Sequence, residues 1–300
     1  MALLPRVNVP GPGSGQIPFL LYGTAYKEDR TAKLTEQALK SGFRGVDTAN
    51  YPTAYNEPLA GDGIAAGLES GIERNDVFIQ SKFTPLWAHD KDKIPFNPDQ
   101  DIEAQVRESV GLTFEHLRVK RLDALLLHAP YPDDEDNVRA WKVLETFVPE
   151  KVDRLGVSNM GLQQLEAIYK AATVKPVIVQ NRFYRPTGYD HDVRGFCEAH
   201  GILYQAFYIL AHNPELLGSD VVDSTARELE VDKEVALYLL ILSLGIMQVL
   251  DGTTRVEAML EDVAAVKTIL GDEDKVKSLE PFVAAFKTLI RELAMSPPET

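Results

Sequence analysis

Residues 45–57, GVDTANYPTAYNE, join a short apolar segment to the start of a helix and decide how the fold is interpreted. The strand-like part ends at Asp47, and the Asn-Glu pair at the end of the stretch opens the next helical pattern. Two tyrosines, Tyr51 and Tyr55, lie in the loop between them. A buried strand, a polar loop and a helix in succession form the repeating unit of α/β proteins. The polar residues that follow the strand are therefore the first candidates for chemistry.

The same unit recurs along the whole chain. Apolar β-type runs are followed by helical patterns such as residues 33–42, 103–117, 162–172 and 233–245, and Gly42, Gly201 and Gly245 are typical helix ends. The predicted strands are 19–22, 43–47, 77–82, 123–128, 152–157, 177–180, 202–207 and 247–250.

Eight such units in a chain of this length predict an α/β fold, a (β/α)8 TIM barrel, with residues 1–300 forming a single domain. Residues 1–17, rich in Pro and Gly, are predicted to be an irregular N-terminal lead-in or a short hairpin. A doubly wound open sheet is the alternative, but its Gly-x-Gly-x-x-Gly turn after the first strand is missing.

The overall charge limits the kinds of partner. The chain has 45 acidic and 31 basic residues and a net charge of -14, which argues against nucleic acid and membrane-surface binding. Its single cysteine, Cys197, excludes an internal disulfide and a multi-cysteine zinc site, and we predict no metal. No stretch reads as a signal peptide or a membrane span, so we expect a soluble, cytoplasmic protein.

Three predicted strands end in residues that rarely close an apolar strand: Asp47, Lys82 and His128. Singly, these residues have ordinary explanations as a helix cap, a rim lysine and a hydrogen-bonded core histidine. Together at one barrel mouth they suit a tyrosine, because a nearby ammonium lowers the pKa of a phenol. Such a set can protonate a carbonyl oxygen while a hydride reaches the carbon, and the hydride donor implies a nicotinamide cofactor.

With these residues in place, the chain resembles the aldo-keto reductase family from about residue 23 to residue 262. The resemblance implies that Asp47, Tyr55, Lys82 and His128 are the catalytic residues and that the barrel reduces an aldehyde or ketone. The sequence motifs that carry it are GT, DTA, YNE, SKF, LLLHAP, GVSNM, VQN and AFYIL, in family order.

The resemblance also implies a set of cofactor-binding residues. Ser158, Asn159 and Gln180 fall where the family binds the nicotinamide carboxamide, and Phe207 falls where a ring stacks on the nicotinamide. A helix cap, a polar strand end and a core aromatic are the alternatives for these positions. The full predicted set is Gly23, Thr24, Asp47, Ser158, Asn159, Gln180, Phe207, Gly252, Thr253, Arg255 and Glu261.

The sequence departs from the family pattern at two places. The family separates its aspartate and tyrosine by about five positions, where this chain has Pro52, so Tyr55 requires a longer loop and Tyr51 is the fallback. We choose Tyr55 because Asn-Glu follows it. Asp251 stands where the family has a phosphate-binding lysine; it would repel a 2′-phosphate or bind a ribose diol. The resemblance implies NADP(H), and Asp251 leaves NAD(H) open.

The sequence therefore predicts an NAD(P)H-dependent reductase of small carbonyl compounds, monomeric by family habit. A non-catalytic nucleotide-binding barrel and a lyase with Lys82 as a Schiff base are the alternatives. Short loops predict an open site for a hydrophobic or bulky substrate. Trp87 is placed at the rim of the pocket or as a loop anchor. The remaining histidines are assigned to the surface: His89, His116, His191, His200 and His212.

Overall fold

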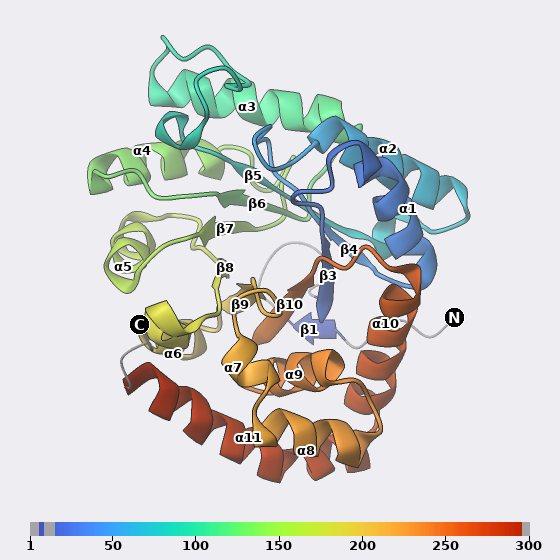
Figure 1. Cartoon of the computed structure of the whole chain (residues 1–300). Helices are drawn as coiled ribbons and strands as arrows, with labels where there is room; N and C mark the ends of the chain where they lie inside the picture. Colours follow the sequence, from blue (N-terminus) through green and yellow to red (C-terminus); the bar gives the residue numbers. More distant parts are fainter. Residues whose placement is uncertain (1–5, 9–15, 296–300) are drawn as a thin grey trace.

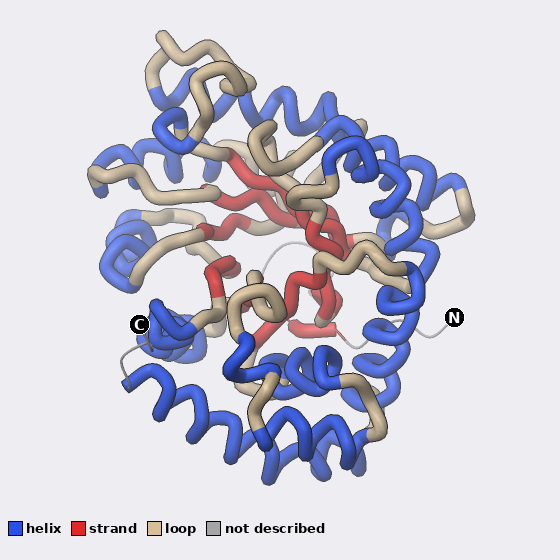
Figure 2. The backbone as a smooth tube through the Cα atoms, viewed as in Figure 1, coloured by secondary structure: helices blue, strands red, loops and turns tan. Residues whose placement is uncertain are grey.

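Parallel strands need both faces covered, and in this chain they close into a barrel with the helices outside (Figures 1 and 2). The structure is a computed structural model and describes residues 6–8 and 16–295. The barrel order is β10-β3-β4-β5-β6-β7-β8-β9, and all its pairs are parallel. The barrel strands are β3 Leu20–Gly23, β4 Gly45–Asp47, β5 Phe78–Phe83, β6 Ala124–Leu127, β7 Leu155–Ser158, β8 Ile178–Arg182, β9 Leu203–Phe207 and β10 Met247–Asp251. The (β/α)8 prediction is confirmed, and each predicted strand overlaps an observed one.

The helices cover the outside of this barrel, and the four helical patterns named above are confirmed, except that α9 ends at Leu242 and Gly245 is not its end. Gly42 ends α1 and Gly201 ends α6 with the left-handed φ angles of 110° and 66° that glycine adopts freely. The helices are α1 Thr31–Ser41, α2 Glu57–Glu69, α3 Ile102–Leu117, α4 Asp134–Glu145, α5 Leu162–Ala171, α6 His191–His200, α7 Pro214–Leu217, α8 Asp220–Leu229, α9 Lys233–Leu242, α10 Val256–Leu270 and α11 Glu273–Met295. Among the described residues, no helix is long and apolar enough to cross a bilayer.

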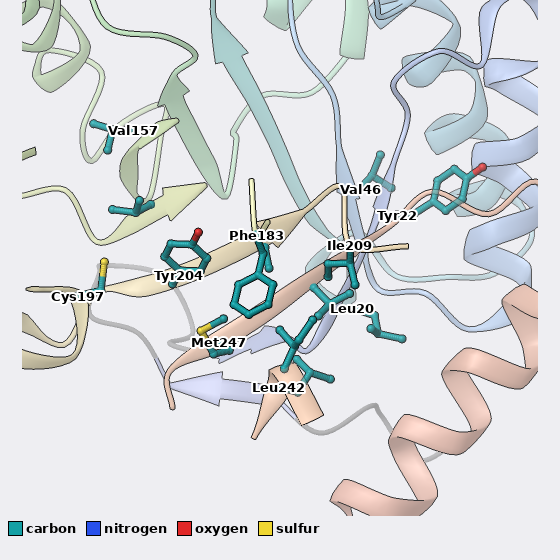
Figure 3. Close-up of a cluster of buried hydrophobic side chains, with 14 of the residues drawn as sticks. Leu20, Tyr22, Val46, Val157, Phe183, Cys197, Tyr204, Ile209, Leu242 and Met247 are labelled. Carbon is teal, nitrogen blue, oxygen red and sulfur yellow. The ribbon is translucent and has the colours of Figure 1, made fainter. Parts of the chain in front are cut away.

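Strand alternation divides the core into two parts. Side chains such as Leu20, Tyr22 and Met247 face outward and pack beneath the helices, where Figure 3 shows part of their cluster. The inward set is small and apolar toward the start of the strands: Ile17, Leu21, Phe78, Ala124, Leu126, Ile178 and Leu203. Nearer the C-terminal ends of the strands, the inward side chains are polar. The inward apolar cluster therefore lies beneath a layer of polar side chains.

The chain start forms an antiparallel strand pair, which matches the short-hairpin alternative and not the irregular lead-in. β1 (Arg6–Asn8) pairs with β2 (Gln16–Pro18), and residues 9–15 between them lie outside the described residues. Ile17 of β2 is fully buried in the inward apolar cluster beside Phe78, at the start of β5. The pair therefore covers the end of the barrel opposite the predicted site.

Helix α2 packs closely against α1 and α3 because it has glycines at the points of contact. A Cβ on Gly61 would lie 2.1 Å from the His116 carbonyl oxygen of α3, and one on Gly63 would lie 2.4 Å from the Ala32 oxygen of α1. Both distances are far below van der Waals contact, so these two positions require glycine. This packing fixes the helix that begins two residues after Tyr55.

Candidate active site

Lys82 and Asp47 form a buried ion pair inside the barrel mouth. Lys82 Nζ donates to Asp47 Oδ2 at 2.6 Å and to the Thr48 carbonyl oxygen at 2.9 Å. Their side chains are 0% and 1% exposed. Both point inward because they alternate with the outward residues of β5 and β4. An ion pair this deep in a protein needs further hydrogen bonds to compensate for lost hydration, and it has them.

Tyr55 is the tyrosine that reaches this pair. Lys82 Nζ lies 3.4 Å from the Tyr55 hydroxyl oxygen and 4.8 Å from the centre of its ring. Tyr51 instead packs edge-on against the rings of His89 and His128, with centroids 5.4 and 5.6 Å away. The loop is long enough for Tyr55 because it turns back on itself, with the Tyr55 N–H donating to the Tyr51 carbonyl oxygen. Of the two phenols, Tyr55 thus has the position expected of a proton donor.

The protonation states differ from the sequence-based expectation. We expected Lys82 to lower the pKa of Tyr55, but burial, followed by the charge of Asp47, raises the pKa of Tyr55 well above its ordinary value. Burial also lowers the pKa of Lys82, and Asp47 opposes this shift. The expectation was wrong because burial of the phenol dominates its pKa, and the charge of Asp47 adds to the upward shift. Tyr55 is consequently a neutral phenol, with a proton to donate, at neutral pH.

His128 completes the group on the other side of Tyr55. The two rings are 5.8 Å apart, and His128 Nδ1 lies 2.7 Å from the hydroxyl of Thr84. Burial, Lys82 and then His89 hold the pKa of His128 well below its usual range, so the imidazole is neutral. If the Thr84 hydroxyl donates to Nδ1, Nε2 carries the proton and can donate to a ligand.

Two histidines assigned to the surface are not simply exposed. His89 is 9% exposed, and its Nε2 lies 3.1 Å from the Thr84 carbonyl oxygen, so it supports the residue that holds His128. His116 Nδ1 lies 2.9 Å from Glu57 Oε2, and the Ser81 hydroxyl donates to the other oxygen of this buried carboxylate. The predictions for both histidines were wrong because ligand spacing along the chain says nothing about contacts between elements.

The residues predicted to hold a nicotinamide carboxamide gather at the neighbouring strand ends. The Ser158 hydroxyl donates to the Gln180 carbonyl oxygen at 2.8 Å, and Asn159 Nδ2 donates to the His128 carbonyl oxygen at 2.9 Å. Gln180 Nε2 is committed to Asp47 Oδ1 at 3.0 Å. The amide oxygens of Asn159 and Gln180 accept no hydrogen bond from any described residue. They are therefore two acceptors with capacity for an N–H donor, which fits a carboxamide.

Other predicted cofactor residues line the same rim. Thr24 binds the Asp47 carbonyl oxygen through its hydroxyl, at 2.9 Å, and Gly23 beside it ends β3. Phe207 ends β9 half-buried, with its ring centroid 5.1 Å from that of Tyr208. Arg255 is exposed at the residue before α10, and Glu261 is exposed on that helix.

Asp251 does not face a ligand, so the argument that it repels a phosphate or binds a ribose was wrong. It is 1% exposed, and its Oδ1 accepts from the Thr253 N–H at 2.9 Å. On β10 it alternates with the inward Gln248 and Leu250, and it therefore points outward beneath the helices. Burial raises the pKa of Asp251, and burial and Asp251 raise the pKa of Asp262 to about 9. Asp262 thus keeps its proton at neutral pH.

The loop of Gly252 and Thr253 is held from beneath by residues near β3. Lys27 donates to the Gly252 carbonyl oxygen, and the Tyr22 hydroxyl donates to the Thr253 carbonyl oxygen at 3.1 Å. The sequence analysis did not select Lys27, because this residue lies in a loop and does not end a predicted strand. The sequence analysis did not select Thr84 either, because it lies two residues after Lys82 and resembles any polar residue of a loop.

This fold and site define a class of protein, and comparison with known proteins gives the same class. The chain matches the family model described as Aldo/keto reductase family over residues 15–273. The protein therefore belongs to the aldo-keto reductase family, as the motifs indicated.

Among its relatives is the glyoxal reductase of Bacillus subtilis, 31% identical over 204 residues, or 68% of this chain and 65% of that protein. An uncharacterized oxidoreductase of the same organism, YtbE, is 32% identical over 206 residues, 68% of this chain and 66% of that protein. These alignments thus span just under two thirds of both relatives.

Solved structures share the whole fold at low identity. An aldo/keto reductase from Brucella melitensis has a TM-score of 0.73 at 23% identity, covering 93% of this chain and 99% of that one. A Bombyx mori aldo-keto reductase in complex with NADP has a TM-score of 0.74 at 18% identity, covering 94% of both chains. At these identities the likeness establishes the barrel alone.

Proposed function

We propose that this protein is an NAD(P)H-dependent carbonyl reductase in which Tyr55 donates the proton. The observation that carries the proposal is the position of Lys82 Nζ, which contacts Asp47 Oδ2, the Thr48 oxygen and the Tyr55 hydroxyl at once. These three acceptors match the three donors of an ammonium group. Lys82 therefore acts as a buried, charged partner of the phenol, and its charge stabilises the phenolate that forms on proton transfer.

The neighbouring side chains have matching roles. His128, neutral because its pKa is lowered, donates from Nε2 to the substrate carbonyl oxygen and orients it toward Tyr55. Tyr55, neutral because its pKa is raised, gives its proton to that oxygen. Asp47 keeps Lys82 charged and in place. Tyr51, beside His89 and His128, forms a wall of the substrate pocket.

A nicotinamide cofactor, when bound, supplies the hydride. The carboxamide would be held by Asn159 and Gln180, which have free acceptor oxygens, with Ser158 behind them and Phe207 beside the ring. Family resemblance and NADP-bound relatives favour NADP(H). Asp251 is buried, so it does not select against a 2′-phosphate, and Arg255 is an exposed cation directly before α10.

The substrate is proposed to be a small aldehyde or ketone. Relatives named for glyoxal and for D/L-glyceraldehyde reduction support a small-carbonyl class. The Schiff-base alternative is less favoured because Lys82 is fully buried and its three donors already have partners. A non-catalytic barrel would have no need of such an arrangement.

The test is cofactor oxidation, followed by absorbance, with NADPH and NADH separately and a panel of aldehydes and ketones. We expect carbonyl-dependent oxidation that is faster with NADPH. Tyr55→Phe should lower kcat by about 10²–10⁴-fold with little change in cofactor affinity, and Tyr51→Phe, the matched control, should stay within about tenfold of the parent. The assignment is wrong if Tyr51→Phe is inactive and Tyr55→Phe is not. Borohydride trapping of a substrate on Lys82 would favour the lyase instead.

A further inference from the structure

Four glutamines fill the polar layer inside the barrel. Gln80, Gln180, Gln205 and Gln248 come from β5, β8, β9 and β10, and each is at most 2% exposed. In their strands they alternate with outward residues, so all four point toward the barrel axis. Only Gln180 belongs to the resemblance with the family. The other three are buried polar groups that the proposed reaction does not yet use.

The glutamines nearest the mouth bind Asp47 directly. Gln80 Nε2 donates to Asp47 Oδ1 at 2.7 Å, and Gln180 Nε2 donates to the same oxygen at 3.0 Å. Each also donates to Gln205 Oε1, at 2.8 Å in both cases. Asp47 therefore has two amide donors on one oxygen and the Lys82 ammonium on the other.

The chain of amides continues down to the N-terminal strand pair. Gln205 Nε2 donates to Gln80 Oε1 at 2.9 Å and to Gln248 Oε1 at 2.8 Å. Gln248 Nε2 donates to the Pro18 carbonyl oxygen of β2. A connected path of hydrogen bonds thus runs from Asp47 through the barrel interior to the strand pair that covers its opposite end.

The two ends of this path fix the direction of every amide. A carboxylate and a backbone carbonyl are acceptors only, so the NH₂ groups of Gln80 and Gln180 must face Asp47 and that of Gln248 must face Pro18. Gln205 is then left with one arrangement that satisfies its neighbours. A flipped amide would place two oxygens, or two NH₂ groups, against each other in a site without water contact, which is costly. The whole set is consistent with Asp47 in its ionised form.

We propose that Gln80, supported by Gln205 and Gln248, is a positioning residue that holds Asp47 ionised and oriented so that Lys82 stays beside Tyr55. The inference rests on the proposed function for its catalytic meaning. Its effect on Asp47 does not depend on the reaction. Loss of one hydrogen-bond donor makes the Asp47 carboxylate less stable relative to the protonated carboxyl, and this can be measured without turnover.

The experiment compares Gln80→Met with the parent protein. Methionine has a similar volume and offers no amide. The matched control is Gln105→Met, which removes another buried glutamine whose Nε2 donates to the carbonyl oxygens of Pro98 and Gln100, away from Asp47. Protonation of Asp47 is followed by NMR of protein labelled with ¹³Cγ-aspartate, with the resonance assigned from Asp47→Asn. The kcat–pH profile with a carbonyl substrate is measured in parallel.

In Gln80→Met, we expect Asp47 to take up its proton at a pH higher by about 1 unit, the order expected for one hydrogen bond to a charged group. The acid limb of the kcat–pH profile should move in the same direction, while Gln105→Met moves neither. An Asp47 resonance that titrates as in the parent overturns the inference, whatever happens to activity. A parent protein that oxidises no NAD(P)H with any carbonyl overturns the proposed function instead.

A second variant covers the case in which Gln80→Met does not fold. Gln205→Met interrupts the same path one hydrogen bond further from Asp47 and leaves both of its amide donors in place. We expect a smaller shift of the Asp47 resonance in the same direction. An unmoved resonance in Gln205→Met then counts against the inference, because the donors would be acting without the support assigned to them.

Discussion

Replacing Lys82 with methionine tests the energetic core of the site. The substitution roughly preserves the buried side-chain volume but leaves Asp47, 1% exposed, without a counter-charge. Asp47 Oδ1 keeps its two amide donors, and Oδ2 loses the ammonium. Breaking a buried pair by removing one partner costs about 3–5 kcal/mol. For a chain of 300 residues that corresponds to a drop in melting temperature of roughly 5–8 °C.

The pH dependence has a definite sign. Without Lys82, the buried carboxyl of Asp47 has a pKa above that of the unfolded chain, about 3.9. The folded variant then binds more protons than the unfolded one, so stability falls as pH rises from about 4. The deficit of Lys82→Met against the parent should therefore be larger at pH 8 than at pH 5.

Thermal melts followed by circular dichroism at both pH values measure this effect. The control is the double variant Asp47→Asn/Lys82→Met, which removes the unpaired charge and should recover at least half of the lost stability. The reasoning is refuted if Lys82→Met melts within about 2 °C of the parent, or if the double variant is no more stable than the single one.

Two further predictions concern stability. Gly61→Ala places a Cβ 2.1 Å from the His116 oxygen, so it should lower the free energy of unfolding by about 1–3 kcal/mol or more in urea titrations, and Gly111→Ala, with open space at its Cβ, should not. Asp262, whose pKa is raised to about 9 beside Asp251, makes the parent lose stability as pH rises from about 4 to 9, because the unfolded chain releases that proton first. Asp262→Asn should consequently gain up to about 5 kcal/mol on the parent at pH 8 relative to pH 4, at about 1.4 kcal/mol per pH unit. A difference in stability between variant and parent that is the same at both pH values would show that Asp262 does not hold its proton.

Barrel topology and the strand-end residues could be predicted because both depend on local pattern. Each strand is a short apolar run before a polar residue, and parallel strands bring those polar ends to one edge. The position of Tyr55 was predictable only through the motif after it. Contacts across the barrel were not predictable, because Gln80, Gln205 and Gln248 look like single polar residues in three separate strands. Asp251 was misjudged because successive side chains of a strand point alternately into and out of the barrel. A change of one residue in the register of the strand therefore reverses the direction of a side chain.

The hydrogen bonds between barrel strands continue past the ends of the strands, and this decides which loops can vary in sequence. The Asn50 N–H donates to the Lys82 carbonyl oxygen and the His128 N–H to that of Phe83, so residues next to the site are still tied to barrel strands. The long connection 84–101, which includes Trp87, starts only after that point. Thr84 and His89 at its start support His128, so the part of the connection beyond His89 is the part that can be exchanged, lengthened or grafted from relatives while the reacting groups keep their places. Substrate choice and chemistry are thus separable in this chain, and a loop-swap library has a rigid base on which to work.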